Sequence, residues 1–417
     1  MIAALVISAA HAACTVLVGA SVHLVDRVVA DGVVVIVDDK IAAAGSKPAG
    51  LDLKSGAKFQ GVVCERIDAV GRHVTAGLVE VSSQLGLYEI GLETGTHDDD
   101  PGGDAIRASF RVVDSYNPDS AVIPIQRVAG VTLAVTNPAS ARLGGLSALV
   151  SLDGATQAET VVLPGASMVA SIGGPSSAVA LMELREVFSA AREQAARRRP
   201  VYEVDSPAAY GASALDLAAL APVLSGDLPL VISANRASDI EALLAFAQAW
   251  KVRLVISGGA EAWRLAGPLA AAGVPVIVDP MSYGPGGFDE LRARADNAVL
   301  LHAAGVPLIL STFGTHQART LAQVAGNAVR AGLDPTVALT AITATPAQVF
   351  GAPDRGRLVA GAVADVVLWS GTPLELSSVP DAVWVEGRRT SMLTRQTLLR
   401  DRYRTLPGTP RPPNPVP

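Results

Sequence analysis

Short, mostly apolar segments that alternate with helical patterns constrain the fold of this chain most strongly. Runs of this kind are typical of buried parallel strands. They occupy residues 131–135, 229–233, 253–257, 274–278 and 306–310. Polar or glycine residues follow each run, and amphipathic stretches begin, for example, at Ser238 and Ala260. The alternation predicts an α/β fold, namely a (β/α)8 TIM-like barrel over residues 75–351.

The two ends of the chain have a different pattern, which is rich in short strands. Within residues 14–74, a β-branched run at 32–37 precedes an Asp-Asp-Lys turn, and residues 352–400 contain a further strand–turn–strand pattern. Residues 401–417 are dense in proline, so we expect an extended tail there.

Residues 1–13 have the pattern of a secretory signal peptide. An apolar stretch leads to Ala10-His11-Ala12, an A-x-A cleavage pattern, although the charged segment that usually comes first is missing. A signal predicts a secreted or periplasmic protein, whereas a frayed first strand would leave it cytoplasmic. The stretch is shorter than the roughly 20 apolar residues that span a bilayer, and no other stretch is as long and apolar, so we expect no membrane span.

The net charge and the cysteine content limit which kinds of partner and which cellular compartment the sequence indicates. The net charge of −6 and the lack of a Lys/Arg block argue against a nucleic-acid partner. Cys14 and Cys64 are the only cysteines. They could pair in an oxidising compartment, or both could be small buried hydrophobic residues.

The segment Val-Thr-Ala-Gly-Leu-Val-Glu-Val-Ser-Ser-Gln-Leu-Gly at 74–86 resembles the first barrel strand of the amidohydrolase superfamily. There the pattern is Pro-Gly-Leu-Ile-Asp-x-His-x-His, with both histidines on a metal. Glu80 stands at the Asp position, and Ser82 and Gln84 stand at the histidine positions. Segments 236–240 and 332–335 also match, most closely to imidazolonepropionase-like members that are secreted.

This resemblance implies a barrel beside one β-sandwich that both chain ends build together. It also implies ancestry among hydrolases of non-peptide C–N bonds, such as cyclic amides, which use zinc or another divalent metal. In them the metal lowers the pKa of a bound water molecule. The substituted positions of this chain put that metal in question.

The other ligand positions are substituted as well. Where the superfamily has His-Ala-His-Arg after strand 5, this chain has Ser233-Ala234-Asn235-Arg236, and Thr312-Phe313 stands in place of a Thr-Asp pair. Among six histidines only His97 and His316 are expected near the barrel mouth. We therefore expect no metal cofactor.

Several residues remain candidates for a site. Glu80, Asp279 and His316 are the candidate catalytic residues, with Glu80 as a general base. Each also has a structural alternative: Glu80 could hold the strand end by hydrogen bonds, Asp279 could form a turn before Pro280, and His316 could make a structural hydrogen bond. The candidate pocket residues are Ser82, Gln84, Ser233, Asn235, Arg236 and Phe313, with Arg236 and His316 suited to an anionic ligand.

Three functions are compatible with these residues. The first is a metal-free pseudoenzyme that binds a small molecule or supports an active homologue. The second is a hydrolase with a rebuilt site made from Glu80, Asp279, Arg236 and His316. The third is a structural or interaction subunit. A homodimer, or a heteromer with a homologous amidohydrolase, is the expected assembly.

Overall fold

The structure is a computed structural model that describes residues 13–54, 56–102, 106–173, 176–197 and 211–404. The predicted signal cleavage pattern and the proline-dense end of the tail lie outside these ranges. Helix α12 (Arg395–Tyr403) continues past residue 400, where the tail was expected to start.

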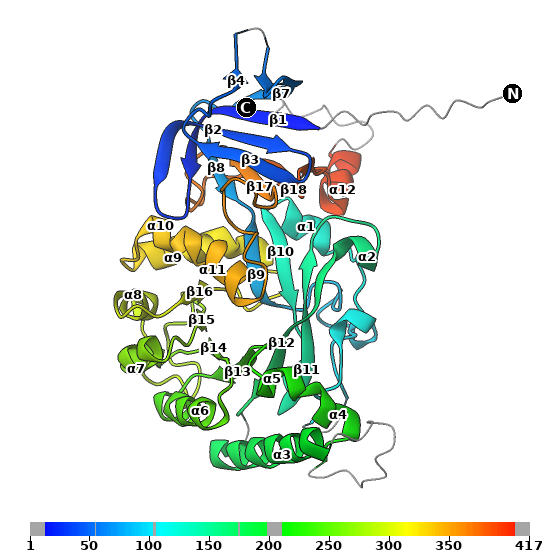
Figure 1. The fold of residues 1–417 in the computed structure, drawn as a ribbon, viewed down its shortest axis with the longest axis vertical. Coiled ribbons are helices and arrows are strands. Elements are labelled where there is room, and N and C mark those ends of the chain that lie inside the picture. The colour runs from blue at the N-terminus through cyan, green and yellow to red at the C-terminus, as the bar shows by residue number, and fades with distance from the viewer. Residues whose placement is uncertain (1–12, 55, 103–105, 174–175, 198–210, 405–417) are drawn as a thin grey trace, which may run out of the picture.

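One sheet combines strands from both chain ends (Figure 1), which confirms that the two ends build a separate β unit. Its central contact joins β8 to β17, whose residues Thr75 and Val367 are partners in an antiparallel register. Leu17, Val366 and Trp384 are buried in its core. The order is β19 (Arg388–Arg389), β18 (Pro380–Val385), β17 (Val366–Trp369), β8 (His73–Ala76), β1 (Cys14–His23), β2 (Val28–Val37) and β3 (Lys40–Gly45), with β7 (Glu65–Asp68) also paired to β1.

A small three-stranded sheet packs on β1 and β2. It consists of β4 (Leu51–Asp52), β5 (Lys58–Phe59) and β6 (Val62–Val63). Leu51 and Phe59 share a buried cluster with Val16 and Val35. A disulfide between Cys14 and Cys64 ties this layer to the start of β1. Of the two alternatives for the cysteines, the structure therefore has the paired one.

The second large sheet is a curled half-barrel of eight strands. Its order is β9 (Leu78–Ser83), β10 (Val131–Thr136), β11 (Leu143–Ser151), β12 (Val161–Ser171), β13 (Leu230–Ala234), β14 (Leu254–Gly258), β15 (Val276–Val278) and β16 (Leu308–Leu310). Each apolar run predicted as a barrel strand coincides with one of β10, β13, β14, β15 and β16, so the predicted barrel class is confirmed.

Part of this sheet departs from a strict alternation of strand and helix. β11 is antiparallel to both β10 and β12. The link between β10 and β11 covers only residues 137–142, and a parallel crossover needs a dozen or more residues. The link from β11 to β12 holds only the single-turn helix α2 (Gln157–Thr160). Short links thus impose a hairpin geometry on this third of the sheet.

The gap between the edge strands β9 and β16 is filled by the end of helix α10 (Pro335–Thr340). Leu310 N donates to Ala341 O at 3.0 Å, and Val79 N donates to Ile342 O at 2.8 Å. Residues 338–347 therefore belong to two helices, because the carbonyl groups of Ala341 and Ile342 bond to strands and a separate helix, α11 (Ala344–Val349), begins after them.

Helices cover the outer face of the sheet, and α6, α7 and α8 lie side by side along one flank (Figure 1). The main ones are α3 (Ser177–Arg197), α6 (Ala237–Trp250), α7 (Ala266–Ala271), α8 (Asn297–Ala303) and α9 (Leu321–Arg330). The inner face is closed by Leu133, Val231, Ile277 and Ile309, with Phe350 from the end of α11. Within the described ranges, no helix is long and apolar enough to cross a lipid bilayer.

Candidate functional site

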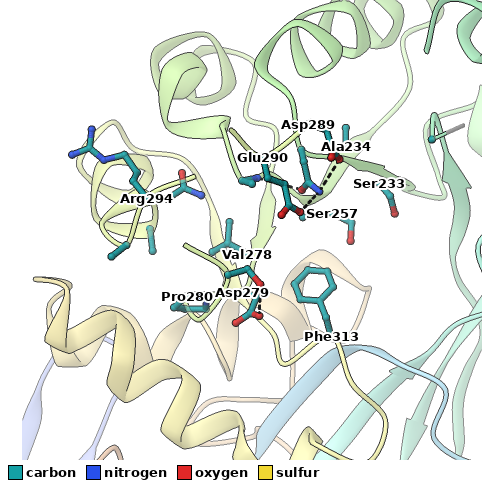
Figure 2. A pocket seen from close by; sticks show the side chains of 18 of the residues that line it. Ser233, Ala234, Ser257, Val278, Asp279, Pro280, Asp289, Glu290, Arg294 and Phe313 are labelled. Carbon is teal, nitrogen blue, oxygen red and sulfur yellow. Dashed lines mark hydrogen bonds between the residues drawn. The ribbon is translucent and has the colours of Figure 1, made fainter. Parts of the chain in front are cut away.

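A cavity of about 390 Å³ opens at the carboxyl ends of β12 to β15 (Figure 2). This is the end of a (β/α) barrel where functional sites are found. The strands supply its floor, and the loop from Asp279 to Arg294 supplies one wall. Lining residues include Ser171, Ser233, Asn235, Ser257, Asp279, Asp289, Glu290, Arg294 and Phe313.

Serine side chains form a row along the floor of this cavity. Ser171 is the register partner of Ser233, and Ser233 is the register partner of Ser257. Ser171 Oγ accepts a hydrogen bond from Gly173 N at 3.1 Å, whereas Ser233 is exposed to solvent. Because neighbouring parallel strands place register partners side by side, the floor offers adjacent hydroxyl groups to a ligand.

Acidic side chains dominate the wall. Asn235 Nδ2 donates to Glu290 Oε1 at 2.8 Å and to Asp289 Oδ2 at 3.3 Å. Asp279 follows β15 directly; its carboxylate accepts from Met281 N and Ser282 Oγ, each at 2.8 Å. These bonds describe a turn, as the structural alternative for Asp279 predicted, and the residue also lines the cavity.

Among the lining residues that the structure describes, the single arginine is paired with a carboxylate outside the cavity. Arg294 binds Asp296 through Nε and through a second bond of 2.6 Å. The Asp296 carboxylate raises the pKa of Arg294, and the guanidinium lies 4.8 Å from the ring centre of Trp263. Figure 2 shows the Arg294 side chain extending away from Asp279 and Glu290.

Phe313 faces Asp279 across the cavity (Figure 2). Its side chain is 39% exposed, and its backbone has φ +50°, a left-handed conformation that bulky residues rarely adopt. Phe313 N donates to Ser311 Oγ at 3.3 Å. Its neighbour Thr312 is fixed by Glu80, so the loop after β16 holds the aromatic ring at the mouth.

Glu80 is buried beneath this loop, and both of its carboxylate oxygens are used. Oε1 accepts from Val81 N and Ser82 N, each at 2.9 Å, and from Ser311 Oγ. Oε2 accepts from Thr312 N at 3.1 Å and from Thr312 Oγ1 at 2.8 Å. We refer to the bonds from Ser311 and Thr312 to this carboxylate as the Glu80 bridge. It joins the first strand of the barrel to the loop after the last one.

A second polar contact joins the same two parts of the barrel. Thr315 Oγ1 donates to Gln84 Oε1 at 2.8 Å and accepts from Gln84 N at 2.9 Å. Gln84 stands at a histidine position of the superfamily pattern, and its amide oxygen is thus already bonded. The first and last strands, which a metal would link in that pattern, are linked here by hydrogen bonds.

The positions that hold metal ligands in the superfamily pattern carry other side chains in this chain. Zinc takes imidazole, thiolate or carboxylate ligands, whereas the corresponding positions hold the hydroxyls of Ser82 and Ser233, the amides of Gln84 and Asn235, and the ring of Phe313. Among the residues that the structure describes, no three His, Cys, Asp or Glu side chains are grouped as a metal site.

The structure brings together only part of the predicted site. Asp279, Ser233, Asn235 and Phe313 line the cavity; Glu80, Ser82, Gln84, Arg236 and His316 are not among its lining residues. His316 Nε2 donates to Glu89 O at 2.8 Å, and its ring lies 5.5 Å from that of Tyr88. These contacts match the structural alternative for the histidine.

Arg236 was expected in the pocket, and the structure places it elsewhere. Its guanidinium forms a two-nitrogen pair with Asp239, one turn further along α6, and donates to Ser177 Oγ at 3.2 Å. Because Asp239 lies on α6, its bond to Arg236 directs the guanidinium along this helix. Asn235 lines the cavity in its place.

Sequence reasoning missed Asp289 and Glu290. They follow the glycine-rich stretch at 284–287, in the loop between β15 and α8. The sequence did contain a signal for them, since two adjacent carboxylates follow a loop that begins at a strand end. It also missed a half-buried pair of histidines in the β unit, where His23 Nε2 and His73 Nδ1 lie 2.8 Å apart.

Comparisons with known proteins agree with this architecture. No protein-family model matches the chain. Amidohydrolase tasK from Hapsidospora irregularis is 24% identical over an alignment of 363 positions that covers 77% of this chain and 36% of that protein. The chain therefore spans about a third of the length of that curated relative.

Solved structures share the fold at low sequence identity. An amidohydrolase from Thermotoga maritima MSB8 has a TM-score of 0.79 at 22% identity, covering 90% of this chain and 99% of that one. A prolidase complexed with N-methylphosphonate-L-proline has a TM-score of 0.56 at 16% identity, covering 91% and 99%. Ochratoxinase from A. niger has 0.54 at 18%, covering 91% and 96%. The chain is thus similar in sequence to a curated amidohydrolase and shares the fold of these solved structures.

Proposed function

We propose that this protein is a metal-independent member of the amidohydrolase fold that binds a small molecule in the cavity at the barrel mouth. The observation that carries the proposal is the Glu80 bridge. This bridge lies where the first and last strands of the barrel meet, which is where the superfamily pattern has metal ligands. Both oxygens of its carboxylate already accept hydrogen bonds.

The polar contacts around this junction favour a folded barrel without a metal. A buried carboxylate is costly unless hydrogen bonds compensate it. Glu80 receives backbone and hydroxyl donors on both oxygens, and Gln84 is satisfied by Thr315. The strand ends are therefore held in place without a cation to organise them.

A hydrolase rebuilt from Glu80, Asp279, Arg236 and His316 has less support. Acid–base catalysis needs groups within hydrogen-bond reach of one substrate position. Of the four residues, only Asp279 lines the cavity. Arg236 is bound to Asp239, and His316 is bound to a backbone carbonyl.

The test is a ligand screen by thermal unfolding, run with EDTA and separately with added zinc, together with a hydrolysis assay on cyclic amides. We expect at least one compound to raise the melting temperature equally in both conditions, and no zinc-dependent hydrolysis. Stabilisation or hydrolysis that appears only with zinc would contradict the proposal.

We also propose that the protein matures in an oxidising compartment outside the cytoplasm. The Cys14–Cys64 disulfide supports this, because disulfides persist where thiols are not kept reduced. Cys14 comes shortly after the A-x-A pattern at residues 10–12. Mass spectrometry of the exported chain tests both points: a start near Ala13 with paired cysteines is expected, and an uncleaved chain with free thiols would refute them.

A further inference from the structure

The charges and shape of the mouth cavity indicate which ligand it takes. We infer that the cavity binds an organic cation, namely a protonated amine attached to an apolar group. This inference rests on the proposed function, because it names the ligand class of the same cavity. It depends on three features: unneutralised carboxylates, free hydrogen-bond acceptors and an aromatic wall.

The charged lining of the cavity is predominantly negative. Asp279, Asp289 and Glu290 contribute carboxylates, and Arg294 contributes the only cation among the residues described there. Arg294 is paired with Asp296, which does not line the cavity. The pKa of Arg236, which lies outside the lining, is raised by its bond to Asp239 and further by the charge of Asp289, so Asp289 alone is partly neutralised. Like charges in one partly enclosed space repel each other, so a bound cation lowers their free energy whereas an anion raises it.

The carboxylates have acceptor capacity left for a ligand. Asn235 Nδ2 reaches one oxygen of Glu290 and one of Asp289. In the part of the chain that the structure describes, their second oxygens, Glu290 Oε2 and Asp289 Oδ1, accept no hydrogen bond. The Asn235 amide thus marks a place where an N–H donor sits between two carboxylates. An ammonium group, with three donors, can bind the free oxygens in the same way.

Apolar side chains beside Asp279 suit the apolar body of such a ligand. The Phe313 ring is partly exposed at the mouth, and Val278 and Pro280 lie near Asp279 (Figure 2). An aromatic face close to a cation adds a further attraction. A volume of about 390 Å³ is near the lower end of the range for small-molecule sites. The ligand is therefore small, with one charged end and one apolar end.

A matched series of probes tests the charge preference. Phenethylamine, 2-phenylethanol and phenylacetate have similar shapes and carry one positive charge, none and one negative charge at pH 7. Titration calorimetry on the full chain, in EDTA, should show that the amine binds roughly tenfold or more tightly than the alcohol, because charge-assisted bonds are about twice as strong as neutral ones. Phenylacetate should not bind.

Substitutions in the cavity test whether the amine binds there. Asp279→Asn and Glu290→Gln should each weaken phenethylamine binding several-fold and leave 2-phenylethanol unchanged. Ser233→Phe, which adds a ring on the cavity floor, should abolish binding of both. Glu241→Gln is the matched control, since Glu241 is exposed on α6 and is not among the lining residues. Circular dichroism of each variant checks that it is folded.

The outcomes separate this inference from the proposed function. Equal affinity for the amine and the alcohol, binding unaffected by the carboxylate variants, or failure of the amine to bind would each overturn the inference. Metal-independent binding of another compound in the screen would still leave the proposed function standing. Stabilisation only with zinc would refute the proposed function, whatever the charge preference.

Discussion

Replacing Glu80 by Gln tests the hydrogen-bond bridge that closes the barrel. The substitution keeps the size of the side chain and exchanges one acceptor oxygen for an NH2 donor. If that NH2 faces Thr312, it meets Thr312 N, which is itself a donor; if it faces the strand, it meets Val81 N and Ser82 N. Either orientation leaves a backbone N–H without its acceptor.

The size of the effect follows from these bonds. A hydrogen bond to a charged group contributes about 1.5–3 kcal/mol, and leaving a buried donor unsatisfied costs about 1–3 kcal/mol, so we expect a loss of roughly 3 kcal/mol in the free energy of unfolding. At about 2.1 cal/mol/K per residue for 417 residues, this corresponds to a fall of roughly 3 °C in the melting temperature.

Thermal unfolding by calorimetry measures this shift, with Glu241→Gln as the control that removes the same charge from the surface of α6. Because Thr312 precedes Phe313, the Glu80 variant should also weaken ligand binding at the mouth. A melting temperature equal to that of the control would refute the view that the bridge holds the strands together.

Two further predictions concern the β unit. Removing the disulfide with the Cys14→Ser/Cys64→Ser double variant should lower the free energy of unfolding by about 4 kcal/mol, because the cysteines are 50 residues apart and the closed loop restricts the unfolded chain. Denaturant unfolding measures this loss. An unchanged unfolding midpoint would contradict the prediction. Burial, and then the nearby His73, lower the pKa of His23 to about 4, below its unfolded value of 6.5. The stability that His23 contributes is therefore complete above pH 6.5 and is lost as the pH falls towards 4. The melting temperature should therefore depend less on pH in the His23→Gln variant than in the unmodified protein between pH 4 and 6.5. An equal pH dependence in both proteins would argue against a role for His23 in this loss of stability.

The sequence predicted the strands of the barrel because apolar runs bounded by turns are a local signal. The runs at 253–257 and 306–310 each contain or overlap an observed strand, β14 and β16. The interruption at Ala341 and Ile342 has no such signal, since it depends on carbonyl groups bonding to strands far away in the chain. Long-range backbone pairing overrides the helical pattern there.

The site was predictable only where it lies on strand ends. Ser233 and Asn235 line the cavity because Ser233 lies near the end of β13 and Asn235 follows that strand directly. Asp289 and Glu290 reach the cavity through a loop whose path no periodicity describes. Arg236 was misplaced because a carboxylate one turn along α6 competes for its guanidinium. Local contacts of this kind decide side-chain direction after the fold is set.

Metal content of the purified mature protein tests the central claim most directly. The chain is dialysed without chelator and analysed by elemental mass spectrometry, with a zinc-binding amidohydrolase treated in parallel as the control. We predict far less than one divalent metal ion per chain, because hydrogen bonds from Thr312 to Glu80 and from Thr315 to Gln84 occupy the junction that the metal would link. One or two tightly bound zinc-like ions per chain would contradict the account.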